Sequence, residues 1–308
     1  MDLEAWLATF DARDALFVAL AGFTVFYLTV LWRAVRVARR GAPEPGMQDR
    51  APTASRIATG AVTNFFDTLG IGSFATTTSI FRFFRMVPDE LIPGTLNVGH
   101  TMGAITQTFI YTTLVPVEST TLVSMIAAAV AGSWLGAGVV ASWPRRRIQV
   151  GMGLCLAGAA GLMFLSQTGL IPGGGELLGV SGARLAIAVG VNFALGALMT
   201  LGIGLYAPCL ILVSLLGMNP TAGFPIMMGS CAFLMPISSA RFIQKRAFHL
   251  GAALGLLIGS IPAVLVAAFI VKSLPLAAVR WLVIVVVLYT SVSMLQSARR
   301  EAAAPAPA

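Results

Sequence analysis

The sequence predicts an all-α polytopic membrane protein. One amino-terminal transmembrane helix precedes two inverted repeats, each a membrane-dipping helical hairpin followed by three transmembrane helices. Three observations lead to this fold class: the apolar composition, an internal duplication and the placement of basic residues. Of 308 residues, 57% are hydrophobic and 10% are charged. A soluble domain carries about 25% charged residues, so this composition indicates a chain that lies largely in lipid.

The duplication appears when the sequence is shifted by 132 positions (200 minus 68), which superimposes the two copies of the pentapeptide TLGIG. Further superimposed pairs are Ala75 with Ala207, Met86 with Met218, Pro88 with Pro220, Pro93 with Pro225 and Ile105 with Ile237. Glycine and proline determine backbone shape, so their shared register indicates duplicated structure. Two apolar segments broken at corresponding positions are typical of a secondary-transporter binding site.

Seven apolar runs reach the length of about 20 residues that a bilayer requires. In chain order they are 15–32, 91–115, 119–143, 148–171, 222–240, 248–271 and 276–295. Two further segments, 57–84 and 185–217, are too long for one span and carry TLGIG near the middle. Each is predicted to form a helix, a glycine turn and a second short helix. The predicted domains are 1–54 (amino-terminal helix and cytoplasmic linker), 55–175 (repeat 1), 183–297 (repeat 2) and 298–308 (flexible cytoplasmic tail).

Basic residues orient the chain because cytoplasmic loops are enriched in them. If each broken segment crossed the membrane once, the arginines at 145–147 would lie opposite those at 33–40. If each segment dips in and returns, 16 of the 20 Lys and Arg residues share the cytoplasmic side. The other four are Arg13, Arg184, Lys272 and Arg280. We therefore expect two re-entrant hairpins, an outside amino terminus and a cytoplasmic carboxyl terminus. The first span, with acids before it and arginines after it, has the reverse polarity of a cleaved signal peptide.

In this topology each repeat crosses the membrane an odd number of times, so the two copies enter from opposite faces. Inverted copies of one unit can exchange shapes, which exposes a central site to one side and then to the other. The alternative is a duplication that only enlarges a helix bundle, as in some channels.

The turns at 69–73 and 201–205 are expected at the protein centre, because non-helical backbone at membrane depth needs polar partners. Helix amino termini that meet there present free N–H groups, which suit an anion. The predicted substrate-binding residues surround the turns and the spans that follow them. They are Asn64, Thr68, Gly70, Gly72, Ser73, Thr76, Thr77, Asn97, Thr200, Gly202, Gly204, Tyr206 and Ser230.

Helix packing is the alternative interpretation for any single small residue, since small residues four apart let helices approach closely. Gly60, Asn64 and Thr68 have this spacing, as do Asn192, Gly196 and Thr200. The run TTTS at 76–79 is different. Four consecutive polar residues point all around a helix, so some must line a polar space.

Asp67 is the one acid of twelve that lies inside an apolar stretch; the other eleven fall in predicted loops or tails. A charge at that depth costs at least about 2.5–3.5 kcal/mol unless it is paired or hydrated. Its counterpart in the second copy is Met199, an asymmetry that suits proton coupling better than architecture. His100 is a second candidate for proton coupling. The alternatives are an Asp67 that is protonated or paired with Asn64 to cap the turn, and a purely structural His100.

The first copy reads NFFDTLGIGSFATTTSIFRFF followed by VPDELIPGTLNVGHTMGAITQT. The second reads NFALGALMTLGIGLYAPCLILVSLLGMNP followed by TAGFPIMMGSCAFLMPIS. These segments resemble the repeated motif of the sulfite exporter TauE/SafE family, over about residues 56–295. The resemblance implies a permease of the bacterial inner membrane for sulfite, organosulfonates or related organic anions. The family usually continues the turn as GIGGG with a following proline, whereas here Ser73 and Leu205 come next.

Other functional classes have no sequence support. The net charge of +8 comes from the predicted cytoplasmic loops, and no nucleic-acid motif accompanies it. There is no HExxH, nucleotide-binding loop or Ser-His-Asp set at plausible membrane depth, so no enzyme, metal or cofactor is predicted. The three cysteines lie in apolar stretches without CxxC spacing. The expected partners are a small anion, the lipid bilayer and protons, and a homodimer is compatible with the sequence. An uncoupled anion channel or uniporter is the functional alternative.

Overall fold

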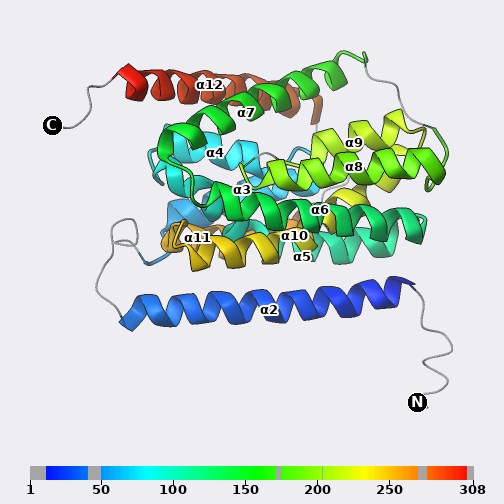
Figure 1. The fold of residues 1–308 in the computed structure, drawn as a ribbon, viewed down its shortest axis with the longest axis horizontal. Coiled ribbons are helices and arrows are strands. Elements are labelled where there is room, and N and C mark those ends of the chain that lie inside the picture. Colours follow the sequence, from blue (N-terminus) through cyan, green and yellow to red (C-terminus); the bar gives the residue numbers. More distant parts are fainter. Residues whose placement is uncertain (1–11, 41–49, 171–174, 203, 270–275, 304–308) are drawn as a thin grey trace.

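The computed structural model describes residues 12–40, 50–170, 175–202, 204–269 and 276–303. Within these ranges the chain forms eleven α-helices and no strand, which confirms the predicted all-α class (Figure 1). Six helices are long and apolar enough to cross a membrane. They indicate a membrane protein, as the composition predicts.

The helices follow one another in two similar series after α2 (Ala12–Arg40). The first series is α3 (Ala54–Thr68), α4 (Ser73–Phe83), the 3-10 turn η1 (Asp89–Leu91), α5 (Ile92–Leu114), α6 (Ser119–Val140) and α7 (Arg145–Gln167). The second is α8 (Gly182–Met199), α9 (Tyr206–Leu215), η2 (Pro220–Ala222), α10 (Gly223–Gln244), α11 (Leu250–Phe269) and α12 (Leu276–Ala303). A shift of 132 residues carries each element of the first series onto its counterpart with boundaries that differ by a few residues.

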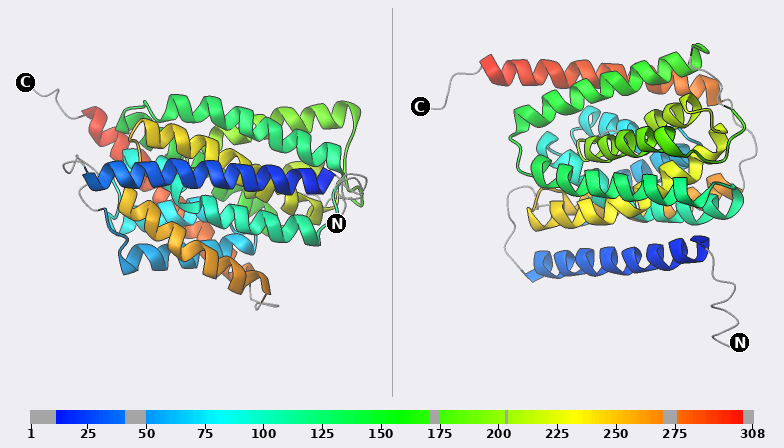
Figure 2. Two further views of the ribbon diagram at one scale, coloured as in Figure 1. Left: turned by 90° about the horizontal axis from the view of Figure 1, so that it is seen from below. Right: turned by 45° about the vertical axis from the view of Figure 1, so that its right-hand side comes forward.

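The packing of the two series is reciprocal. Helix α3 packs against α11, and its counterpart α8 packs against α6, which is the counterpart of α11. In the same way, α5 with α11 matches α10 with α6, and α4 with α12 matches α9 with α7. The pairs α5 with α10 and α7 with α12 each join a helix to its own counterpart. Figures 1 and 2 show α2 along one side of this bundle and the α7 and α12 pair along the opposite side.

Glycines bring the reciprocal helix pairs into close contact. A Cβ atom on Gly60 of α3 would lie 2.6 Å from the Cα of Leu256 in α11. A Cβ atom on Gly196 of α8 would lie 2.2 Å from the carbonyl oxygen of Ala129 in α6. Neither position has room for a side chain. These two glycines therefore serve helix packing, which supports the packing interpretation of the four-residue spacing.

The second broken segment returns to the end of the bundle at which it starts. Leu177, before α8, forms a bridge with Met218, after α9. The Gly175 amide donates to the Met218 carbonyl at 3.0 Å, and the Asn219 amide donates to the Leu177 carbonyl at 2.8 Å. Helices α8 and α9 therefore form a hairpin with both ends together.

The first broken segment is arranged in the same way. Arg56 near the start of α3 contacts Gly255 near the start of α11. The start of α5, which follows α4 after a short connection, contacts the same region, because the His249 amide donates to Thr95 Oγ1 at 2.9 Å. The α3–α4 segment thus begins and ends on one side of the bundle.

Basic residues gather at this side, which we call the basic end and define by Arg82, Arg145 and Lys245. Lys245, just after α10, donates to the Gly138 carbonyl near the end of α6 at 2.7 Å. Arg82 near the end of α4 and Arg145 at the start of α7 both form ion pairs with Asp89. The starts of α3, α5, α7 and α11 therefore lie close to the ends of α4, α6 and α10.

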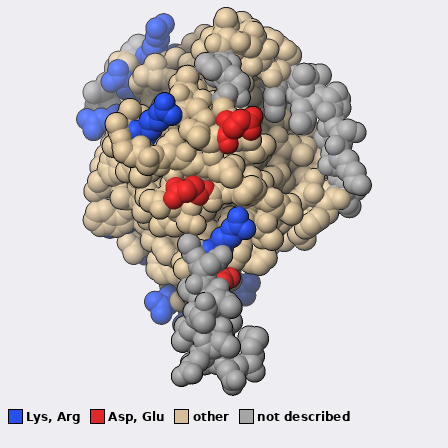
Figure 3. All heavy atoms as spheres, turned by 90° about the vertical axis from the view of Figure 1, so that its right-hand side faces the viewer, with Lys and Arg blue, Asp and Glu red and all other residues tan. Residues whose placement is uncertain are grey.

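The opposite end of the bundle is where α6 and α8 begin. There the Val180 amide donates to Thr121 Oγ1 at 2.9 Å, and the Glu118 amide donates to the Leu178 carbonyl at 2.9 Å. Figure 3 shows this end face-on, and most of its described surface is neither acidic nor basic. The described charges are thus divided unequally between the two ends.

Some individual elements differ in detail from the sequence predictions. The six apolar helices include α8, expected as half of a hairpin, but not α5, expected as a full span. Helix α5 has 23 residues but carries many buried polar side chains, Asn97 and Gln107 among them, which lower its hydropathy. Asp14 lies in the first turn of α2 and Glu301 near the end of α12, so these two acids are in helices, whereas Asp89 is buried in the connecting turn η1. Helix α12 was expected as a span, and the side chains of some of its residues are not among those that the structure describes.

Candidate functional site

Both TLGIG segments form tight turns between the helices of their hairpins. Gly70 and Gly202 have φ angles of 84° and 90°, in the left-handed region that favours glycine. Each amide donates to the carbonyl three residues before it, Asp67 and Met199 respectively, at 2.9 Å. The first glycine of TLGIG therefore has the same geometry in both copies. Ile203 lies outside the described residues.

The two turns meet at a small cavity in the centre of the bundle. It is lined by Asp67, Gly72, Ser73, Phe74, His100, Ala104, Met199, Gly204, Leu205, Tyr206, Cys231 and Met235. The lining includes the first residues of α4 and of α9, so the amino termini of both short helices face it. Its volume is about 10 Å³, room for about one water molecule. An anion of several heavy atoms does not fit in this conformation, so binding requires the two hairpins to separate.

Asp67 is the acid that lines the cavity, and 4% of its surface is exposed. Its Oδ1 accepts a hydrogen bond from the Ser73 amide at 2.5 Å, at the start of α4. Its Oδ2 accepts from Gln107 Nε2 of α5 at 2.9 Å. The carboxyl group therefore caps the second helix of its hairpin. Asn64 is not its partner, so that part of the capping alternative is wrong.

Tyr206 connects the acid to the other repeat. Its hydroxyl oxygen lies 3.2 Å from Asp67 Oδ2 and 2.5 Å from Gln107 Oε1. Tyr206 begins α9 in repeat 2, whereas Asp67 and Gln107 belong to repeat 1. Gln107 Nε2 also donates to Thr68 Oγ1 at 3.0 Å, which sets the orientation of the amide. This cluster of three side chains is the polar contact at which the two hairpins meet.

His100 lines the same cavity but has a fixed neutral arrangement. Asn64 Nδ2 donates to the Gly60 carbonyl at 2.7 Å and lies 2.8 Å from His100 Nδ1. Since Nδ2 is a donor, Nδ1 must accept, and the ring hydrogen lies on Nε2, 3.0 Å from Thr77 Oγ1. Both ring nitrogens are thus occupied in the neutral form, which supports the structural alternative for His100.

Several other predicted site residues lie outside the cavity lining. Asn97 Oδ1 accepts from Ser238, and Ser230 Oγ accepts from Asn192, both between helices. Thr200, Thr76 and Thr68 donate to carbonyl groups of their own segments, and Gly70 and Gly202 form the turns. Asn64 and Thr77 reach the cavity only through His100. The structure thus brings together Asp67, Gly72, Ser73, His100, Gly204 and Tyr206 from the predicted set.

Gln107 and Tyr111 are functional candidates that sequence reasoning missed. They follow one another at a spacing of four on α5, and the Tyr111 hydroxyl donates to the Thr68 carbonyl at 2.8 Å. A polar stripe on a predicted span was the available signal, because Gln107 is a fully buried amide with a threonine on each side. Cys231 and Met235 of α10 complete the cavity wall, but nothing in their local sequence distinguishes them.

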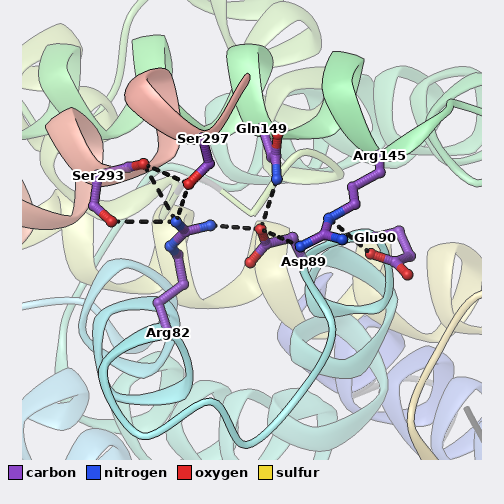
Figure 4. A network of polar contacts seen from close by, with 7 residues as sticks. All are labelled: Arg82, Asp89, Glu90, Arg145, Gln149, Ser293 and Ser297. Carbon is purple, nitrogen blue, oxygen red and sulfur yellow. Dashed lines mark hydrogen bonds and ion pairs between the residues drawn. The ribbon is translucent and has the colours of Figure 1, made fainter. Parts of the chain in front are cut away.

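A second polar network lies at the basic end, around Arg82 of α4 (Figure 4). Arg82 forms an ion pair with Asp89 at 2.5 Å and donates to Ser297 Oγ of α12 at 2.9 Å. Gln149 of α7 donates to the same carboxylate at 2.8 Å, and Arg145 lies 3.7 Å from it. The network joins the end of the first hairpin to α7 and α12. The counterparts of Arg82 and Asp89 are Ser214 and Thr221, so the second hairpin lacks this ion pair.

Comparisons with protein-family models, with curated proteins and with solved structures found no match. The resemblance to the TauE/SafE family therefore rests on the quoted residues alone. Among the described residues, no group of three or more His, Cys, Asp or Glu side chains gathers to hold a metal ion.

Proposed function

We propose that this protein is a secondary transporter that moves a small anion together with a proton by alternating access. The observation that carries the proposal is the central cavity, where the amino termini of α4 and α9 meet beside one buried acid, Asp67. Two short helices whose amino termini converge at mid-bundle are the arrangement that transporters use for anionic groups.

The charges around the cavity favour coupling to a proton. Among its described lining residues there is no Lys or Arg, so the helix termini alone attract an anion. An ionised Asp67 would place a second negative charge beside that anion in a poorly hydrated space, where repulsion is strong. Once the hairpins have separated, the site is therefore expected to take the anion together with a proton on Asp67. One proton then accompanies each anion.

Alternating access is supported by the reciprocal packing of the two helix series. The main helix pairs between repeat 1 and repeat 2 each have a partner pair with the roles exchanged. If the repeats are inverted in the membrane, each repeat can adopt the shape of the other, and the site changes sides. The Arg82–Asp89 ion pair lies at the basic end and has no counterpart in the second hairpin, so the two ends of the bundle are held differently.

The basic end is placed in the cytoplasm by the positive-inside rule. This orientation gives an outside amino terminus, a cytoplasmic carboxyl terminus and two hairpins that dip in from opposite faces. The TauE/SafE resemblance supports the bacterial inner membrane as the location and sulfite, an organosulfonate or a related organic anion as the substrate. An uncoupled anion channel or uniporter is the alternative, favoured if the anion crosses the membrane without a proton.

The proposal is tested by measuring sulfite and sulfonate uptake into proteoliposomes with and without an imposed pH gradient. We expect accumulation above the external concentration when the gradient drives protons in the direction of uptake. Uptake that only equilibrates, whatever the gradient, would establish the uncoupled alternative.

Asp67→Asn is the matched variant for coupling. The amide keeps the size and most of the hydrogen bonds of the acid but exchanges no proton. We expect substrate exchange between equal concentrations to persist at a reduced rate, while accumulation driven by the pH gradient is lost. Wild-type accumulation in this variant would remove Asp67 from the coupling mechanism.

A further inference from the structure

The contacts between Asp67, Gln107 and Tyr206 form a closed triangle. Asp67 Oδ2 lies 2.9 Å from Gln107 Nε2 and 3.2 Å from the Tyr206 hydroxyl, and that hydroxyl lies 2.5 Å from Gln107 Oε1. All three side chains are buried. Each of the three contacts needs one hydrogen atom between its two polar atoms, because buried polar atoms in contact are otherwise repulsive.

The neutral side chains supply only two of these three hydrogens. One N–H of Gln107 points at Asp67, and the other is used by Thr68 Oγ1. The Tyr206 hydroxyl has a single hydrogen, which can serve Gln107 or Asp67 but not both. Turning the Gln107 amide over changes which contact lacks a hydrogen and not the count. Two donors therefore face three contacts in either orientation.

We infer that Asp67 carries the third hydrogen, and that Asp67, Tyr206 and Gln107 together form one proton-binding site shared by the two hairpins. The carboxyl O–H donates to the Tyr206 hydroxyl, which in turn donates to Gln107 Oε1 across the shortest of the three contacts. Gln107 and Tyr206 act as positioning residues for the proton on Asp67. This assignment rests on hydrogen-bond geometry; its role in coupling rests on the proposed function.

Loss of that proton weakens the contact between the repeats. The Tyr206 hydroxyl must then turn its hydrogen toward the carboxylate, which leaves Gln107 Oε1 against an oxygen without a hydrogen between them. Tyr206 begins α9, so the strain falls on the junction between the second hairpin and α5. In the absence of the anion, the protonated site therefore holds the cavity shut, and the deprotonated site favours separation of the hairpins.

The other groups that face Asp67 do not supply the missing hydrogen. Tyr111 of α5 donates to the Thr68 carbonyl, and His100 of α5 is occupied at both ring nitrogens. Cys231 of α10 has its sulfur 3.6 Å from the sulfur of Met199. Cys209 of α9 is buried, and among the described cavity-lining residues none is Lys or Arg.

The native thiol of Cys231 reports on opening, because it lines the cavity and is 2% exposed. We would replace the other cysteines, Cys155→Ala and Cys209→Ala, and measure the rate of labelling by a small methanethiosulfonate reagent against pH. The thiolate is the reacting form, so chemistry alone raises the rate about tenfold per pH unit. An opening step that releases one proton adds about another tenfold per unit, up to the pH at which Asp67 is ionised.

In this parent protein, we expect the logarithm of the labelling rate to rise by about two per pH unit at acid pH. Above the pH at which Asp67 is ionised, it should rise by about one per pH unit. In Asp67→Asn the slope should be about one throughout, with slow labelling, because the amide supplies a permanent hydrogen to Tyr206. In Tyr206→Phe labelling should be fast even at acid pH. The infrared carbonyl band of a protonated carboxylic acid should be present in the parent at acid pH and missing in Asp67→Asn.

Three labelling results would overturn the assignment. They are a slope of about one in the parent, a slope of about two at acid pH in Asp67→Asn, and labelling of Tyr206→Phe as slow as that of the parent. An infrared acid band that survives Asp67→Asn unchanged would overturn it as well. No anion is present in these measurements. The proton site can therefore hold even if no anion transport is found. Conversely, gradient-driven uptake together with a labelling slope of about one would support the transporter but not this proton site.

Discussion

At the residue scale, the two TLGIG turns are less alike than their letters. Gly72 has a φ of 89°, in the left-handed region, whereas Gly204, its counterpart, does not have a positive φ. Both glycines line the cavity, and a Cβ atom on either would meet nothing within 4 Å. A side chain at Gly72 thus strains the backbone, while one at Gly204 only occupies the space of the cavity.

Gly204→Val therefore tests the cavity without straining the turn. We expect it to abolish anion uptake in proteoliposomes while its thermal unfolding temperature stays near that of the wild type. Gly72→Val should also abolish uptake, but with destabilisation of about 1 kcal/mol or more from the left-handed backbone. Wild-type uptake in Gly204→Val would show that the anion passes elsewhere.

At the element scale, the end of the first hairpin carries an ion pair that the end of the second lacks. The Arg82 side chain is 13% exposed and links α4 to the η1 turn and to α12. Nearby Arg85 is exposed, has a φ of 51° and stands where the second copy has Gly217. Two arginines three residues apart thus have very different environments.

Arg82→Ala is expected to lower the free energy of unfolding by about 1–3 kcal/mol, because it leaves the buried Asp89 with weaker partners. Arg85→Ala is the matched control, with an expected change within about 0.5 kcal/mol. Thermal unfolding in detergent compares the two variants. Equal effects would mean that the network in Figure 4 adds no stability.

Glu118 caps the start of α6 in the connection outside the membrane-spanning helices. Its carboxylate accepts from the Thr121 hydroxyl and from the Thr121 and Thr120 amides. These hydrogen bonds, that of the Thr121 side chain foremost, lower the pKa of Glu118 from 4.5 to about 2. The stabilisation is therefore complete above pH 4.5 and is lost as the pH falls toward 2.

Glu118→Ala should lower stability near neutral pH by about 0.5–1 kcal/mol, a modest value because the side chain is exposed. The difference from the wild type should shrink as the pH falls from 4.5 to 2. Unfolding temperatures measured across this pH range check the expectation, and a difference that does not depend on pH contradicts it.

At the scale of the whole molecule, the reciprocal packing and the paired hairpin ends agree with the in-and-out topology of the broken segments. We expect a reporter fused after Arg147 or after Arg246 to be cytoplasmic. A reporter near Gly174, which lies outside the described residues beside Gly175, should be periplasmic. The same side for Arg147 and Gly174 would contradict two re-entrant hairpins.

The sequence by itself determined the features that depend on local chemistry. Apolar composition indicates helices in lipid, because a backbone there must satisfy its own hydrogen bonds. The repeated glycines mark the turns, because a left-handed residue favours glycine wherever it lies. The exceptional position of Asp67 in an apolar stretch was likewise visible from its neighbours alone.

Only the tertiary structure decided which side chains meet. Tyr206 lies 139 residues from Asp67 along the chain, and Gln107 lies 40 residues from it, yet the three form one cluster. It also decided that Asn64 binds His100 rather than Asp67, and that Gly204 differs from Gly72. Such contacts depend on how the helices of one repeat pack against those of the other. Packing is set by the combined shapes of many distant side chains, so no short stretch of sequence carries it.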